Sequence, residues 1–115
     1  MNLSQRNNNP VNLRYAGQRE ATGRGEKDFA LFSTPMAGWR AAHSQIVLDQ
    51  TRRLSLKEFI FKFAPPVEND TNAYLDFVCR ELRISPDEDL KDISKYALAG
   101  VMARQEGYFN LDESV

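Results

Sequence analysis

The sequence predicts an α+β fold that is mostly α-helical, with four to five helices and a small N-terminal β-hairpin. Two observations predict it. Residues 33–105 repeat apolar side chains at the helical period and are divided by residues that start or stop helices, whereas residues 11–32 hold short alternating runs typical of strands. With 115 residues, of which 42% are apolar and 27% charged, the chain can form one core, so we expect a single domain over residues 1–115.

Composition excludes several classes of protein. The 15 Lys and Arg nearly balance the 16 Asp and Glu, so no overall charge attracts nucleic acid, and we expect no nucleic-acid partner. The single cysteine (Cys79) and single histidine (His43) exclude a disulfide framework and a cluster of such metal ligands, so we expect no metal and no cofactor. No apolar run is long enough for a membrane span or a signal peptide. We therefore expect synthesis in the cytoplasm without a signal peptide and no membrane insertion.

The N-terminal third predicts the hairpin. The first ten residues are polar and close in Asn-Asn-Asn-Pro at residues 7–10, which favours turns, so we expect a flexible arm there. Residues 11–15 alternate apolar and polar side chains and predict one strand, and residues 28–32 predict the second. The glycine-rich residues 17–27 then form a long mobile tip. Because two strands alone are marginal in water, the hairpin must lean on the helices.

Local signals mark where each helix begins. Ser33 or Thr34 can cap a first helix, Pro35 suits its first position, and the period runs to about Arg52. The apolar face predicted for this helix consists of Met36, Trp39, His43, Ile46, Val47 and Gln50.

Two capping boxes predict two further helices. Residues 55–58 (Ser-Leu-Lys-Glu) start a short helix, and residues 85–88 (Ser-Pro-Asp-Glu) start a last helix from about Leu90 to Gln105. Gly107 is well placed to terminate that last helix.

A rigid polar corner at residues 64–71 (Ala-Pro-Pro-Val-Glu-Asn-Asp-Thr) separates two helical segments. Pro65 stops the preceding helix because it lacks an amide proton, and Asp70 and Thr71 can start the next one by capping its free amides. From the residues alone, such a corner is either pure architecture or the lip of a site.

Several segments, taken in order, resemble a known family. They are residues 6–15, Phe29-Ala30-Leu31-Phe32, Gly38-Trp39-Arg40-Ala41, residues 63–71 with Tyr74, and Met102-Ala103-Arg104-Gln105-Glu106-Gly107. Together they resemble the lysozyme-like family often labelled phage virion or structural protein, over nearly the whole chain. The block at residues 64–71 is the most specific. Here the hairpin precedes the candidate glutamate, which implies a circularly permuted lysozyme arrangement.

The resemblance implies peptidoglycan cleavage by a muramidase or a lytic transglycosylase of phage or prophage type, with glycan strands as the partner. It points to Glu106 as the general acid. Glycosidic cleavage needs a protonated carboxyl, and an apolar setting at a helix C-terminus raises the pKa of such a group. Glu106 follows an apolar helical stretch and precedes Gly107, Tyr108 and Phe109. The alternative is a solvated terminal glutamate.

Other residues receive roles from the same resemblance. A partner carboxylate near the hairpin would be Glu20, although a transglycosylase needs no second acid. The expected sugar-binding residues are Asn8, Asn9, Asn12, Tyr15 and Tyr108. An enzyme of this kind would act in the periplasm or as a virion component, together with phage or secretion-machine proteins.

Two departures from the family pattern motivate a second hypothesis. Val11 replaces an expected glycine, and no asparagine follows Glu106. The second hypothesis is therefore a catalytically inactive lysozyme-like module that is structural or binds glycans. A third is a helical adaptor that contacts protein through the basic N-terminal region, with an affinity that weakens with salt.

Overall fold

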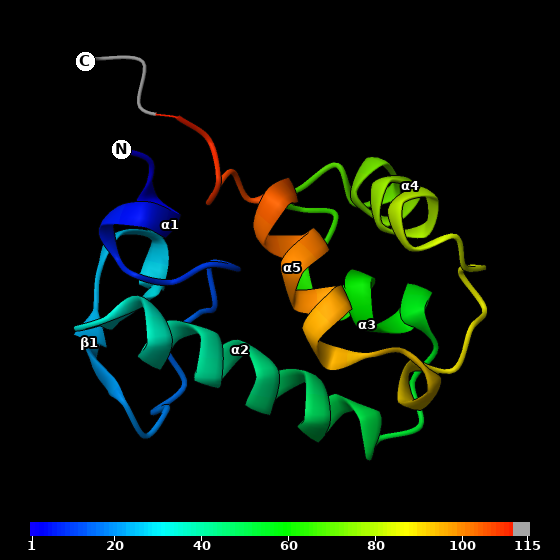
Figure 1. Cartoon of the computed structure of the whole chain (residues 1–115), viewed down its shortest axis with the longest axis horizontal. Coiled ribbons are helices and arrows are strands. Elements are labelled where there is room, and N and C mark those ends of the chain that lie inside the picture. Colours follow the sequence, from blue (N-terminus) through cyan, green and yellow to red (C-terminus); the bar gives the residue numbers. More distant parts are fainter. Residues whose placement is uncertain (112–115) are drawn as a thin grey trace.

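Five α-helices and a two-stranded antiparallel hairpin make up residues 1–111, the part of the chain that this computed structural model describes. The elements in chain order are α1 (Leu3–Arg6), β1 (Ala21–Arg24), η1 (Glu26–Asp28), β2 (Ala30–Phe32), α2 (Pro35–Gln50), α3 (Leu56–Phe63), α4 (Thr71–Leu82), η2 (Leu90–Asp92) and α5 (Lys95–Gln105). The predicted α+β class is confirmed. Figure 1 shows α1 and the hairpin near one end of α2, with α3 and α4 above its other half.

Three of the helices, α2, α3 and α4, begin where the capping signals predicted. The Thr34 hydroxyl accepts a 3.2 Å bond from the Ala37 amide at the start of α2. Ser55 and Glu58 form a reciprocal capping box at the start of α3. The Asp70 carboxylate caps α4. Each cap satisfies an amide that has no partner within the helix, and so fixes the first turn.

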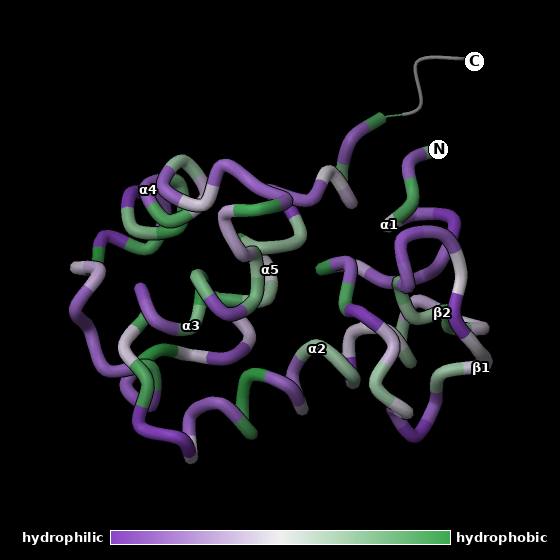
Figure 2. Tube along the Cα trace, turned by 180° about the vertical axis from the view of Figure 1, so that it is seen from behind, coloured by the Kyte–Doolittle hydropathy of each residue, from purple (hydrophilic) through white to green (hydrophobic). Residues whose placement is uncertain are grey.

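The core lies where α2, α3, α4 and α5 meet. α5 packs against both α2 and α4, and α3 packs against α4. Figure 2 shows apolar and polar residues alternating along α4, as expected for a helix that buries one side. The largest fully buried apolar side chains of this core are Ile46, Leu56, Phe59, Ile60, Leu90, Leu98 and Met102.

The buried face of α2 differs from the predicted one. Met36 and Val47 are exposed at 61% and 39%, whereas Ala42, Ile46 and Asp49 are buried. Ile46 is buried as expected, and Gln50 donates to the Leu90 and Ile93 carbonyls. The buried face therefore includes Asp49, whose carboxylate is bound by Lys62 of α3, in place of Val47.

The N-terminal segment, expected to be a flexible arm, is integrated into the fold. Asn2 and Gln5 form a capping box for α1. The Asn2 side chain donates to the Gly107 carbonyl at 2.8 Å, and that of Gln5 donates to the Tyr108 carbonyl at 3.1 Å. Ser4 is fully buried. These bonds attach α1 to the chain that leaves α5.

The hairpin forms at a different place from the one predicted. β2 pairs with Ala21–Arg24, in the stretch expected to be a loop, and the expected strand at residues 11–15 makes only an isolated bridge, between Arg14 and Phe29. Asn12 explains the difference, because its φ of 54° interrupts an extended strand. The prediction of a two-stranded hairpin is confirmed, and its first strand was placed wrongly.

The last helix begins later than predicted. Residues 85–88 do not cap it: the Ser85 hydroxyl accepts from the Asp87 amide, and the Glu88 amide donates to the Ser85 carbonyl, which closes a turn. The chain then runs extended beside residues 54–56, so it cannot be helical there. α5 starts at Lys95 with Ser94 as its cap. No helix of the described residues is long and apolar enough to cross a membrane.

Candidate active site

A groove of about 940 Å³ lies where the N-terminal region meets the helices. Its lining comes from α1, residues 12–14, Ala16 and residues 27–29 in the N-terminal region, and from α2, α3 and the polar corner that follows α3. Glu106, just after α5, also lines it. Polar groups in the lining include Asn12, Gln45, Asp49, Lys62, Glu68 and Glu106. The corner is therefore the lip of a groove as well as a helix stop.

Glu106 is positioned by the way α5 ends. It is the C-cap residue, and Gly107 follows in the left-handed conformation with φ +83°. The Gly107 amide donates to the Arg104 carbonyl at 3.1 Å and the Tyr108 amide to the Ala103 carbonyl at 3.0 Å, which is a Schellman motif. A glycine adopts this conformation without strain. The prediction that Gly107 terminates the last helix is confirmed.

The carboxyl of Glu106 is half-buried, and its pKa is raised above the ordinary value. Burial is the main cause, since it penalises the charged form. The Asn12 side-chain amide donates to Glu106 Oε1 at 2.9 Å, and this bond and the neighbouring Tyr74 hydroxyl offset part of the rise in the pKa. The C-terminal end of α5 also disfavours a negative charge there.

Two polar atoms beside Glu106 are incompletely satisfied. Asn12 Oδ1 and the Tyr74 hydroxyl are buried and make no hydrogen bond of regular geometry within the described residues. Burial and the charge of Glu106 raise the pKa of Tyr74 well above its usual value. A buried polar group without a partner costs about 1 to 3 kcal/mol. Three polar groups with incomplete hydrogen bonding therefore lie close together: the Glu106 carboxyl, the Asn12 side-chain oxygen and the Tyr74 hydroxyl.

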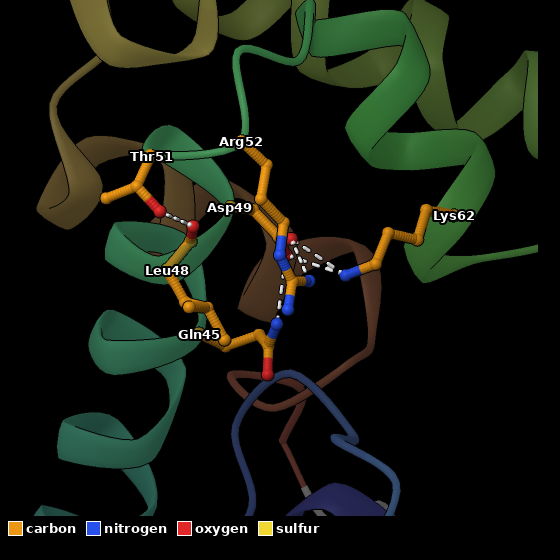
Figure 3. A network of polar contacts seen from close by, with 6 residues as sticks. All are labelled: Gln45, Leu48, Asp49, Thr51, Arg52 and Lys62. Atoms are coloured by element: carbon orange, nitrogen blue, oxygen red, sulfur yellow. Dashed lines mark hydrogen bonds and ion pairs between the residues drawn. The ribbon is translucent and has the colours of Figure 1, made fainter.

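A second carboxylate, Asp49, lies in the groove wall and is 1% exposed. Lys62 Nζ donates to both of its oxygens at 2.8 and 3.0 Å, and Arg52 and Gln45 each donate at 2.9 Å (Figure 3). Burial raises the pKa of Asp49, but the bonds from Lys62, Gln45 and Arg52 outweigh it and lower the pKa overall. Asp49 is therefore an ionised group whose oxygens are fully engaged.

The remaining groove carboxylates also face cations. Glu68 forms an ion pair with Arg14, and Asp28 lies 3.8 Å from Arg24. Among the groove carboxylates of residues 1–111, Glu106 alone has no cationic partner. It is also the one whose pKa is raised. The surroundings of Glu106 thus favour its protonated form.

Of the asparagines predicted to bind sugar, Asn12 lines the groove and the other two do not. The Asn9 side chain donates to the Leu13 and Ala30 carbonyls at 2.9 Å each and accepts from the Leu13 amide. Asn8 donates to the Phe32 carbonyl at 3.1 Å. Asn9 therefore links Leu13 to β2, and Asn8 binds the last residue of β2.

The two predicted sugar-stacking tyrosines lie outside the groove lining. The Tyr15 ring lies under the guanidinium of Arg24, 4.9 Å from the ring centroid. The Tyr108 ring packs edge-on against Trp39, with centroids 5.6 Å apart. The structure therefore does not bring Tyr15 or Tyr108 together with Glu106.

Glu20, the predicted partner carboxylate, is also absent from the groove lining. It accepts two 2.6 Å hydrogen bonds from Arg40 of α2. These bonds lower the pKa of Glu20. Its carboxylate is occupied by this ion pair and is not placed beside Glu106.

Sequence reasoning missed Asp49 and Lys62, which both line the groove. A signal existed, because Asp49 follows Ala42 and Ile46 at the helical spacing i, i+4, i+7 and so belongs to the buried face of α2. An acidic residue on that face indicates a buried charge that needs a cation. The position of the cation on α3, thirteen residues later, had no local signal.

Comparison with known proteins found one informative relative. No family model matches the chain. The chain is 31% identical to Protein P5 of Pseudoalteromonas phage PM2 over 114 residues, an alignment that covers 91% of this chain and 71% of the phage protein. The chain therefore belongs to the family of this phage protein.

Proposed function

We propose that this phage-related protein is a peptidoglycan-cleaving glycosidase, either a muramidase or a lytic transglycosylase, in which Glu106 is the general acid. The observation that carries the proposal is a half-buried carboxyl with a raised pKa in the wall of a groove large enough for sugar rings. A general acid must keep its proton near the working pH, and burial without a neighbouring cation favours this.

The chemistry assigned to Glu106 begins with transfer of its proton to the glycosidic oxygen as the bond to the anomeric carbon breaks. In hydrolysis, a water then adds to that carbon and gives one proton back to the Glu106 carboxylate. In transglycosylation, a hydroxyl of the same sugar forms the new bond, and its proton returns to the Glu106 carboxylate. The second route needs no further carboxylate. Asp49, Glu68 and Glu20 are each held in an ion pair with a cation, so none of them is offered as a second catalytic carboxylate. This favours the transglycosylase route.

Asn12 supports this assignment as a residue that orients the acid. Its amide donates to Glu106 Oε1, and its side chain lines the groove beside that carboxyl. The phage relative favours a setting in which the cell wall must be opened. The proposed sites of action are the virion or the periplasm, where the partners are glycan strands and other phage proteins.

The direct test measures turbidity loss of purified cell walls. Wild type is expected to clear the walls, Glu106→Gln to lose at least about a hundredfold in rate, and the exposed control Glu26→Gln to retain full activity. Equal clearing by wild type and Glu106→Gln removes Glu106 from the mechanism. No clearing by wild type, with binding of chitooligosaccharides retained, favours the inactive glycan-binding module instead.

Two further measurements separate the routes. Mass spectrometry of the released sugars distinguishes hydrolysis from transglycosylation, because the transglycosylase product is lighter by one water. Glu20→Gln is expected to leave the rate unchanged if Glu106 acts alone. A large loss of rate would instead support a two-carboxylate mechanism in which the pair of Glu20 and Arg40 opens.

A further inference from the structure

The ammonium group of Lys62 is held in the groove by a buried carboxylate. Lys62 lies in the last turn of α3, and Asp49 near the end of α2 faces it across the helix interface (Figure 3). Both side chains line the groove, and the Lys62 side chain is 47% exposed while that of Asp49 is 1% exposed. The Lys62 ammonium is therefore held by a buried carboxylate and is accessible from the groove.

The charges in this cluster do not cancel. One carboxylate, Asp49, is shared by Lys62 and Arg52, which leaves a net charge of one positive unit. An ammonium has three donors, and among residues 1–111 its hydrogen bonds go to Asp49 alone, so at least one donor stays available. Lys27 also lines the groove, and it makes no ion pair within residues 1–111.

Burying the charged carboxylate of Asp49 costs free energy. A protein with two apolar residues in place of such an ion pair is often at least as stable. The arrangement fixes the place of the Lys62 ammonium, as an anion-binding site requires, because a preorganised cation loses little side-chain freedom when a ligand binds. A carboxylate is the matching ligand for such a donor.

We propose that Lys62 is the subsite for a carboxylate carried by the bound glycan, and that this subsite distinguishes peptidoglycan from uncharged amino-sugar polymers. The inference rests on the function proposed above. Peptidoglycan carries carboxylates in its peptide stems and, once the stems are removed, on its lactyl groups, whereas chitooligosaccharides carry none. Both sources present the same chemistry to Lys62.

The test measures binding in the Glu106→Gln background, so that no bond is cut. The ligands are soluble glycan strands with their peptide stems, the same strands after an amidase has removed the stems, and chitooligosaccharides of matched length. We expect the carboxylate-bearing strands to bind about tenfold more tightly than the neutral oligomers, and Lys62→Met to abolish that difference. Whichever strand preparation responds to Lys62→Met identifies the source of the carboxylate.

Two controls keep the result interpretable. Lys57→Met removes another lysine of α3 that does not line the groove, and it should leave all affinities unchanged. If Lys62→Met does not fold, the double variant Asp49→Leu/Lys62→Met removes the ammonium without leaving a buried charge unpaired.

Two results would count against the inference in different ways. Equal affinity for neutral and carboxylate-bearing ligands, or an equal loss for both in Lys62→Met, overturns the subsite and leaves the proposed function standing. Absence of binding to all three ligands, together with no clearing of cell walls by wild type, overturns the proposed function itself.

Discussion

The side-chain amide of Asn12 donates a 2.9 Å hydrogen bond to Oε1 of Glu106, across 94 residues of sequence. The bond joins the N-terminal loop to the end of α5 and directs the carboxyl into the groove. Asn12 adopts φ 54°, a conformation that asparagine tolerates better than most residues. One residue therefore provides both the turn in the loop and the donor to the acid.

Replacing Asn12 by glycine removes the donor and keeps a residue that accepts the left-handed backbone. Because the Asn12 bond lowers the pKa of Glu106, its loss should raise that pKa further. We expect the alkaline limb of the pH–rate profile to move to higher pH and kcat to fall about tenfold. An NMR titration of the Glu106 carboxyl checks the same shift directly. An unchanged pKa would show that the bond is not maintained in solution.

Glu106→Gln is expected to stabilise the protein at neutral pH. The folded-state pKa of Glu106 lies above its ordinary value of 4.5, so the stabilising contribution is present below that value and is lost as pH rises through the folded pKa. Above the ordinary value the unfolded chain releases this proton more readily than the folded protein does, which opposes folding. Urea unfolding should show a gain of about 1 kcal/mol at pH 7 and little change at pH 4. A loss at both pH values would contradict the electrostatic argument.

Asp49→Asn should destabilise the fold by about 3 kcal/mol, since it leaves Lys62 and Arg52 without their counter-charge in a partly buried site. The folded pKa of Asp49 is lowered, so its contribution is present above the ordinary value of 3.8 and disappears as pH falls through the lower folded pKa. Urea unfolding from pH 7 to pH 2 measures this. Asp76→Asn, an exposed change on α4, serves as the matched control and should change the free energy of unfolding little.

Gly38 and Gly100 form a contrasting pair of helical glycines. A Cβ on Gly38 would lie 1.9 Å from the Asn8 carbonyl oxygen and 2.8 Å from Pro10 Cδ, whereas a Cβ on Gly100 would meet nothing within 4 Å. We expect Gly38→Ala to cost about 2 to 4 kcal/mol and Gly100→Ala to gain about 0.5 to 1 kcal/mol. Thermal unfolding of both variants checks the pair. Equal effects would show that α2 does not approach the N-terminal loop so closely.

The helix ends were predictable because each is encoded within a few residues. Thr34, Ser55 and Asp70 accept bonds from amides three residues later, and Gly107 closes α5 through bonds to residues three to five positions back. The capping box predicted at Ser85 does not form, because a contact with a distant segment is stronger than the local signal. Residues 54–56 pair with the chain just beyond Ser85 and override its local preference.

The hairpin shows what local pattern alone could not provide. The alternation at residues 11–15 is typical of a strand. The Asn9 side chain, however, forms hydrogen bonds with the backbone amide and carbonyl of Leu13 and with the carbonyl of Ala30, twenty-one residues away. A side chain thus replaces part of a sheet ladder. Such long-range bonds leave no periodic trace in the sequence.

By itself, the sequence determined the fold class, most helix boundaries and a glutamate at the end of the last helix, because caps and amphipathic faces depend on near neighbours. Tertiary structure alone decided which polar groups share the groove. It placed Asn12 against Glu106, set Asp49 behind Lys62 and left Glu20 paired with Arg40 elsewhere. The physical reason is that burial and charge pairing, which set the protonation of a carboxyl, depend on residues brought together from distant parts of the chain.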